Sequence, residues 1–307
     1  MGMSSILLPE LFFLGLLAMT AIRVMITGDA TGPAGTFVFL SILAAVGIYL
    51  NKRYNSDPLN PRRHYGFFIL MLAIYSSLGF ALEAIFIDNL RTTGTAADQT
   101  FQAFDKTLDP NLLFGFMKRI ANTWPPMITY CYYEILSLAY LLLLPIEAAG
   151  LWFLARKDVH TLRLFSIGLF TLHGVGFLGY TIKPAVGPIA IQDKVHLATL
   201  FNLSTPSLTE VQYTLTGFLS IRYDAFPSLH IAISLYILTF CIQYRLLNIP
   251  YSLMLGAIVF LVSLSSIALG YHYFLDSITG VLLVGVGFMA ISVQSYFDRS
   301  TELSPPA

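Results

Sequence analysis

The chain alternates between long apolar runs and short segments rich in charged residues, proline or glycine. A run of about 20 apolar residues crosses the hydrocarbon of a bilayer as a helix, and eight runs approach that length. They lie near residues 5–27, 35–51, 66–88, 128–155, 161–182, 228–244, 250–270 and 274–297. The pattern therefore predicts an all-α polytopic membrane protein with about eight spans, with ends uncertain by a few residues.

Composition agrees with this fold class and excludes others. The 307 residues are 56% apolar and 11% charged, and this balance is too apolar for a soluble domain of the same length. The formal net charge is zero and the basic residues cluster in short loops, so we expect no nucleic-acid partner. Only Cys131 and Cys241 are present, both inside apolar runs, and they predict neither a disulfide framework nor a zinc site.

The loops give an orientation. Lysine and arginine are enriched in short cytoplasmic loops of membrane proteins. Two short connections are basic, with Lys52, Arg53, Arg62 and Arg63 in the first and Arg156, Lys157 and Arg163 in the second. An even number of spans then places both termini in the cytoplasm. Loops 89–127 and 183–227 are expected on the outer face, which is periplasmic, extracellular or lumenal.

Two histidines stand at the ends of apolar runs. His230 follows Ala-Phe-Pro-Ser-Leu and opens the sixth run, whereas His272 precedes the eighth run. The chain between them makes one trip across the membrane and one trip back, each of about 30 Å. Both histidines should therefore return to the same outer face.

The spacing around His272 indicates proton-transfer chemistry. Asp276 lies four residues later, a spacing that stacks side chains on one side of a helix. The carboxylate would accept a hydrogen bond from one imidazole nitrogen and leave the other available as a nucleophile or base. His230 would supply a second proton-transfer group. The helix start after Pro227 and Ser228 would offer free N–H groups to a phosphate.

Other interpretations of these residues exist. A lone histidine at a membrane interface is usually structural, and His230, His272 and Asp276 together form a possible set of metal ligands. The sequence places neither a fourth ligand nor a glutamate base for a metal site, so we expect no metal and no cofactor. Ionisable residues at membrane depth are expensive and tend to be functional. Convergence of all three on one face favours catalysis.

The segments around His230 and His272 resemble the signature motifs of a known family. Pro227-Ser-Leu-His230 and His272-Tyr-Phe-Leu-Asp276 resemble the second and third signature motifs of the type 2 phosphatidic acid phosphatase superfamily, and most closely its inositol phosphorylceramide synthase branch. Tyr180 through Pro188 is similar to the first motif, and Asp105 through Pro110 to a pre-span segment of bacterial members. The resemblance implies a six-helix catalytic core over 66–297, preceded by two additional helices in 1–65 and followed by a cytoplasmic tail, 298–307.

The resemblance also implies roles for single residues. His272 would be the nucleophile that forms a phosphohistidine, Asp276 its orienting partner, and His230 the acid that protonates the leaving group. From the charges and the helix start near the motifs, and not from the resemblance, we expect Lys183, Pro184, Arg222 and Ser228 to bind the substrate phosphate. For Lys183 and Arg222 the alternative is ordinary snorkelling of a long basic side chain at the interface.

The chain departs from the hydrolase pattern at its phosphate-binding cations. Ser266 stands where hydrolases have an arginine, Gly176 where they have a lysine, and Lys183 where an arginine precedes the proline. A phosphomonoester dianion needs several cations, whereas a phosphodiester carries one negative charge. The departures favour a phosphotransferase that moves a phospho-head-group from a phospholipid donor to a hydroxyl-bearing lipid or glycan acceptor.

Two further functions remain open. The first is hydrolysis of phosphatidate or a polyprenyl pyrophosphate, with water as the acceptor. The second is a lipid transporter or scaffold without catalysis, although the inverted repeats typical of many transporters are not visible.

Several other features are weaker. Residues 99–122 are expected to form one or two interfacial helices, either a lid or a packing element. His173 is expected to be a packed, hydrogen-bonded residue, and Glu83, Glu134 and Glu147 receive no role.

Overall fold

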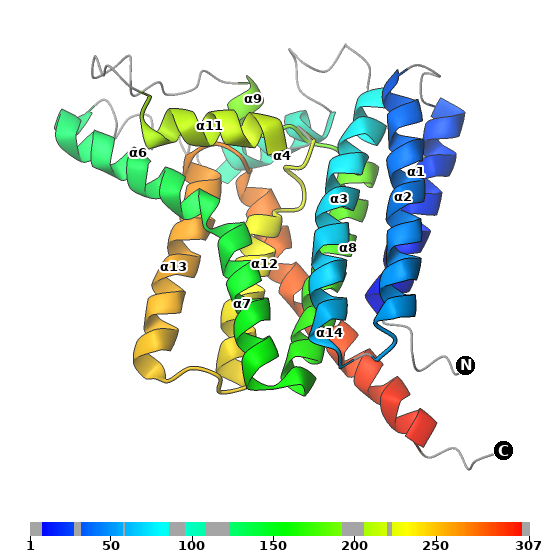
Figure 1. Ribbon diagram of the computed structural model, residues 1–307. Helices are drawn as coiled ribbons and strands as arrows, with labels where there is room; N and C mark the ends of the chain where they lie inside the picture. Colours follow the sequence, from blue (N-terminus) through cyan, green and yellow to red (C-terminus); the bar gives the residue numbers. More distant parts are fainter. Residues whose placement is uncertain are drawn as a thin grey trace.

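The computed structural model describes residues 8–27, 32–57, 59–85, 96–108, 123–191, 206–219 and 223–302. In this part of the chain the regular elements are α-helices, with one isolated β-bridge between Ala185 and Asp224. Long helices stand side by side and shorter ones lie across one end of the bundle (Figure 1). The predicted all-α membrane fold is confirmed.

The long helices match the predicted apolar runs. Six are long and apolar enough to cross a membrane: α1 (Leu8–Thr27), α2 (Gly32–Tyr54), α3 (Pro61–Ile85), α8 (Val159–Ile182), α13 (Ile249–Ala268) and α14 (Phe274–Glu302). The fourth run forms a pair, α6 (Pro126–Leu141) and α7 (Leu143–Lys157), bent by 44°. The sixth run forms a shorter apolar helix, α12 (Leu229–Gln243). These helices are roughly consistent with the predicted count of about eight spans.

Helix α12 is shorter than α8, α13 and α14, against which it packs. Its 15 residues extend about 22 Å, less than the hydrocarbon thickness of about 30 Å. The preceding segment, residues 223–228, is irregular and lies inside the bundle, where Pro227 and Ser228 are buried. The first turn of α12 therefore lies below the end of the bundle that carries α4 and α11 (Figure 1).

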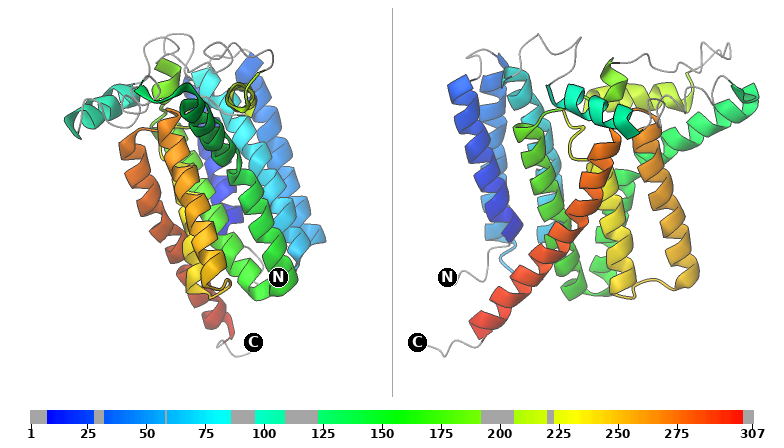
Figure 2. Two further views of the ribbon diagram at one scale, coloured as in Figure 1. Left: turned by 90° about the vertical axis from the view of Figure 1, so that its left-hand side faces the viewer. Right: turned by 180° about the vertical axis from the view of Figure 1, so that it is seen from behind.

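Short helices cover the end of the bundle above α12. These are α4 (Ala96–Leu108), α9 (Pro188–Ile191) and α11 (Leu208–Leu219), and the views in Figure 2 show α4 and α11 lying across the long helices. Helix α4 covers the first part of the predicted helical segment 99–122, whereas residues 109–122 fall outside the described residues, and the interfacial location stays a prediction. Glu134 of α6 accepts the N–H groups of Leu208 and Thr209, and so caps the start of α11.

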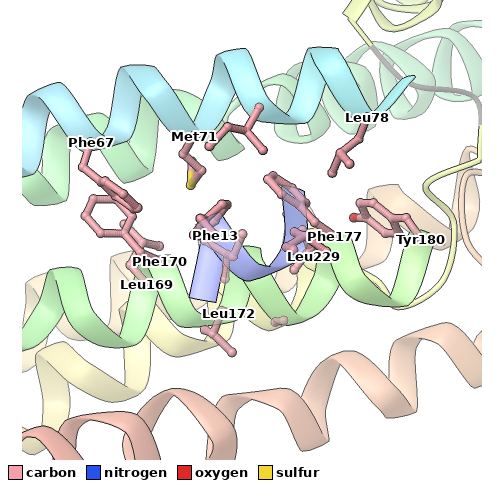
Figure 3. Packing of buried hydrophobic residues seen from close by; sticks show 14 of the residues in the cluster. Phe13, Phe67, Met71, Leu78, Leu169, Phe170, Leu172, Phe177, Tyr180 and Leu229 are labelled. Carbon is pink, nitrogen blue, oxygen red and sulfur yellow. The ribbon is translucent and has the colours of Figure 1, made fainter. Parts of the chain in front are cut away.

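Helix α8 forms the centre of the core. It packs against α1, α3, α7, α12 and α14, and Figure 3 shows phenylalanine rings of α1, α3 and α8 gathered on one side of it. The Phe13 ring centroid lies 5.4 Å from that of Phe67 and 5.8 Å from that of Phe177. The first helix is therefore integrated with the rest of the bundle. The division into residues 1–65, 66–297 and 298–307 stays a prediction.

Both predicted cytoplasmic loops lie at one end of the bundle. The α2–α3 and α7–α8 connections are found at the end where α1 begins and α14 ends, opposite α4 and α11 (Figure 1). At this end, Arg63 binds Glu10 through two hydrogen bonds of 2.9 and 2.7 Å, and both side chains are buried. The orientation of this end toward the cytoplasm remains a prediction.

The buried Arg63–Glu10 pair should be sensitive to loss of one partner. Glu10→Ala leaves a buried guanidinium without its carboxylate and should cost about 3–5 kcal/mol of stability, whereas Glu10→Met with Arg63→Leu should recover much of this loss. Thermal melting of the purified protein in detergent measures both. Arg62→Gln changes an exposed neighbouring arginine and serves as the control. Equal melting of Glu10→Ala and wild type would contradict the prediction.

Candidate functional site

His272 lies in the turn between α13 and α14. Gly270 has a positive φ of 81°, which lets the chain reverse direction after α13. The N–H groups of Tyr271 and His272 then donate to the Ser266 carbonyl at 3.1 and 3.0 Å. The Nδ1 atom of His272 lies 2.6 Å from the Ala225 carbonyl oxygen. Because a carbonyl only accepts, Nδ1 carries the hydrogen and Nε2 of the neutral ring keeps its lone pair.

Asp276 does not form the expected hydrogen bond with His272. Its Oδ2 lies 3.9 Å from Nδ1, and it accepts the N–H of Tyr273 at 2.8 Å instead. The expectation assumed a continuous helix over both residues, but α14 begins only at Phe274, so His272 lies outside its helical geometry. The fully buried carboxylate remains in ion-pair range of the imidazole. Its catalytic role stays a prediction.

His230 lies in the first turn of α12 and faces His272. The two ring centroids are 5.6 Å apart, so the histidines meet as the sequence predicted. The His230 ring stacks on Tyr140 of α6 at 4.2 Å, and Tyr140 stacks on Tyr271 at 4.4 Å. Gln212 of α11 donates to the Tyr271 hydroxyl at 2.9 Å. This column of aromatic rings holds His230 in place.

Backbone hydrogen bonds join the three motif segments. Ala225 N–H donates to the Ala185 carbonyl at 3.0 Å, and Ile189 N–H donates to the Gly270 carbonyl at 2.7 Å. The N–H of Ser228 lies 3.3 Å from the Asp276 carbonyl. Residues 183–189, 223–230 and 270–276, which are far apart in the sequence, therefore form one structural unit.

The predicted substrate-binding residues differ in their positions. Lys183 directly follows α8 and is exposed, with its Nζ 4.7 Å from the Phe101 ring and 5.7 Å from the Phe226 ring. Pro184 is buried beside it. Ser228 is buried next to His230, and its hydroxyl has no hydrogen-bond partner among the described residues. Arg222 lies outside the described residues.

Close packing occupies the two positions where the hydrolase pattern has cations. Ser266 is fully buried at the end of α13. A Cβ on Gly176 would lie 2.5 Å from the side chain of Leu229, so α8 meets the start of α12 without space for a longer residue. The lysine and arginine of the hydrolase pattern are therefore replaced by two small, closely packed residues, Gly176 and Ser266.

Two functional neighbours were not predicted from the sequence. The Tyr75 hydroxyl of α3 donates to Asp224, the residue before the Ala225 carbonyl that holds His272. Asp224 adjoins the second motif, which is a signal that could have identified it. Tyr75 lies in an apolar run without any such signal. Asp98 and Asp105 of α4 also contact the motif segments.

The surroundings of His272 keep its imidazole neutral. Burial lowers the pKa of His272 below its ordinary value, and the Ala225 carbonyl and the negative charge of Asp224 partly raise that pKa again. A neutral ring is the form that has a nucleophilic nitrogen. The site therefore favours the reactive form at neutral pH.

His173 and Glu147 form another buried contact between ionisable residues. His173 Nδ1 donates to the Leu169 carbonyl at 3.0 Å, and its Nε2 lies 3.3 Å from Glu147, in ion-pair range without a hydrogen bond. The packed position expected for His173 is confirmed. The Glu83 side chain lies outside the described residues. Within the described ranges, no three His, Cys, Asp or Glu side chains converge as metal ligands would.

Comparison with known families decides the classification. The sequence profile of the PAP2 superfamily matches residues 108–290, more than half of the chain. The protein belongs to the PAP2 superfamily. No curated protein and no solved structure gave a match. The matched region contains all three motif segments, and α1, α2 and α3 precede it. This membership makes the protein a membrane enzyme of the lipid phosphatase or phosphotransferase class.

Asp224→Asn should change the pH dependence of the enzyme. Asp224 raises the pKa of His272, so its neutralisation should lower that pKa and shift the acid limb of kcat/KM to lower pH. A pH–rate profile of lipid turnover measures the shift. Asp57→Asn makes the same charge change at the opposite end of the bundle and should leave the profile unchanged. A shift to higher pH in Asp224→Asn would exclude this electrostatic role.

Gly280 and Gly285 of α14 provide a matched pair of substitutions. A Cβ at Gly280 would lie 2.7 Å from the Ser228 carbonyl, whereas one at Gly285 meets nothing within 4 Å. Gly280→Ala should displace α14 from the start of α12, and a shift of about 1 Å lowers turnover roughly 100-fold. Gly285→Ala should retain activity and gain up to about 1 kcal/mol of helix stability. Comparable activities and melting temperatures for the two variants would refute the close contact.

Proposed function

We propose that the protein is an integral membrane lipid phosphotransferase that works through a phosphohistidine at His272. The main support for the proposal is that two imidazole rings, those of His230 and His272, lie next to each other. One is held by the Ala225 carbonyl through Nδ1, and the other, His230, lies 5.6 Å away between ring centroids. This arrangement supports nucleophilic attack by one ring and proton transfer by the other.

The first half-reaction transfers the head group to the enzyme. The Nε2 lone pair of His272 attacks the phosphorus of the donor lipid, an N–P bond forms, and the P–O bond to the diacylglycerol oxygen breaks. His230, which must be protonated for this step, gives its proton to that oxygen, so diacylglycerol leaves as a neutral alcohol. Neutral His230 and a phosphohistidine carrying the head group remain.

The second half-reaction regenerates the enzyme. Neutral His230 takes the proton of an acceptor hydroxyl, whose oxygen attacks the phosphorus while the N–P bond breaks. The product is a new phosphodiester, and His230 is protonated again. The two half-reactions together balance in atoms and charge without a redox partner or an external acid.

Charge at the site supports a phosphodiester as the donor. Across residues 180–188, 223–230 and 270–276 the sequence has one lysine or arginine, Lys183. The same segments contain Asp224 and Asp276. One cation, the N–H groups at the start of α12 and the Ser228 hydroxyl match a single negative charge better than a dianion. Arg222 is proposed as a further ligand on the basis of the sequence alone.

Two motif sequences and the burial of His272 support a particular class of substrates. Ala225-Phe-Pro-Ser-Leu-His230 and His272-Tyr-Phe-Leu-Asp276 resemble the inositol phosphorylceramide synthase branch, so we propose a phospholipid donor with a polyol head group and a hydroxyl-bearing lipid or glycan acceptor. His272 is only 4% exposed. Such burial limits access of water to the phosphohistidine and favours transfer over hydrolysis.

The site is proposed to face the outer side of the membrane. The basic residues of the α2–α3 and α7–α8 connections lie at the opposite end of the bundle. By the positive-inside rule that end is cytoplasmic, together with both termini.

The covalent intermediate provides the direct test. Intact-mass analysis after brief incubation with a mixed phospholipid extract should detect an acid-labile adduct of a head group plus phosphate on the wild type. His272→Ala should show no adduct and no turnover, because it removes the nucleophile, and a cooperative melting transition of this variant is the control that it is folded. The adduct should disappear when a hydroxyl-bearing acceptor lipid is added.

Other outcomes of that measurement would change the assignment. A bare phosphoryl adduct would support the phosphatase reaction instead of head-group transfer. The absence of an adduct with every lipid tested would contradict the phosphohistidine mechanism. Turnover by His272→Ala at the wild-type rate would remove His272 from the chemistry.

A further inference from the structure

Helix α4 presents one face to the candidate active site. Asp98, Phe101 and Asp105 are spaced three and four residues apart, so they lie on the same side of the helix. Asp98 and Phe101 are each 1% exposed, and Asp105 is partly buried. Two of these three inward residues are carboxylic acids, which is unusual for the buried face of an amphipathic helix.

Asp98 connects the first motif segment to the third. Its carboxylate accepts the N–H of Val186 at 3.1 Å and the N–H of Gly187 at 3.0 Å. It also accepts the hydroxyl of Tyr273 at 3.1 Å. Gly187 has a φ of 80°, and a Cβ there would collide with the Tyr271 carbonyl, so this turn lies directly on the His272 segment. Charge-assisted bonds of this kind are strong when buried.

Asp105 holds the start of the helix that carries Asp276. It accepts the N–H of Phe274, the first residue of α14, at 3.0 Å. A carboxylate at this place satisfies a free N–H and interacts with the positive end of the helix dipole. Burial raises the pKa of Asp105, and the N–H groups of Phe274 and Leu275 oppose that rise.

Phe101 contacts residues of all three motif segments. Its ring lies 4.7 Å from Lys183 Nζ in the first segment. Its centroid lies 4.9 Å from that of Phe226 in the second segment and 5.8 Å from that of Tyr273 in the third. The aromatic face therefore positions the cation of the site by a cation–π contact while packing against the other two segments.

We propose that α4 positions the catalytic centre, with Asp98 as the principal positioning residue. Asp98 sets the distance between the segment that carries Lys183 and the segment that carries His272, although it does not reach the substrate itself. Residues 96–107 precede the region matched by the PAP2 profile. The effect on turnover rests on the function proposed above.

The test compares Asp98→Asn with Lys106→Gln, an exposed residue on the same helix. Asparagine keeps the shape of aspartate but turns an N–H₂ group toward backbone N–H donors. We expect kcat of Asp98→Asn to fall about tenfold to a hundredfold while KM stays near the wild-type value, because positioning and not binding is lost. Asp98→Glu should recover part of the rate, and Lys106→Gln should behave as wild type.

A second readout does not depend on activity. Hydrogen–deuterium exchange should become faster in peptides covering 184–189 and 272–277 of Asp98→Asn, and stay unchanged in Lys106→Gln. In a double-mutant cycle, Tyr273→Phe should have little additional effect once Asp98 is asparagine. These results would show a local link between the two segments.

Three outcomes would overturn the inference. The first is that Asp98→Asn keeps the kcat and the hydrogen–deuterium exchange of the wild type. The second is that exchange rises over the whole bundle while the melting temperature falls. The third is that the effects of Asp98→Asn and Tyr273→Phe are fully additive. If the wild-type protein turns over no lipid, the proposed function fails, and the exchange measurement still decides whether α4 links the segments.

Discussion

The hydrogen bond from His272 Nδ1 to the Ala225 carbonyl is the constraint on which the site depends. It selects the tautomer, so the second nitrogen of the ring has the lone pair needed for attack on phosphorus. It also sets where the second motif must lie, because the acceptor is a backbone atom five residues before His230. A backbone acceptor cannot be altered by a side-chain substitution at residue 225, so the link is fixed by the path of the chain.

The overall fold was largely predictable, since hydrophobic run length is a direct physical requirement for crossing a bilayer. Each of the eight runs corresponds to a helix or to the bent α6–α7 pair. The bend near Leu142 and the shortness of α12 were not predictable, because the fourth and sixth apolar runs show no break at these positions. The meeting of His230 and His272 was predictable from counting membrane crossings.

The finer structure of the site was less accessible from sequence. The spacing of His272 and Asp276 suggested a helical hydrogen bond, but the first residue of α14 is Phe274, and a helix boundary of this kind is uncertain by a few residues. Asp98 gave no signal of its own, because its partners, two backbone N–H groups and the Tyr273 hydroxyl, lie far along the chain. Contacts to backbone atoms leave no pattern in the sequence of the partner.

Helix α1 shows what the buried polar contacts mean for assembly in the membrane. Glu10 pairs with Arg63, 53 residues later, and Arg23 donates to the Thr181 carbonyl, 158 residues later. During synthesis the first helix is made well before either of these partners. A single helix with an unpaired glutamate and arginine inserts poorly into lipid. The polar contacts of α1 can therefore be completed only after α3 and α8 have been made, so the final packing of the first helix depends on the later ones.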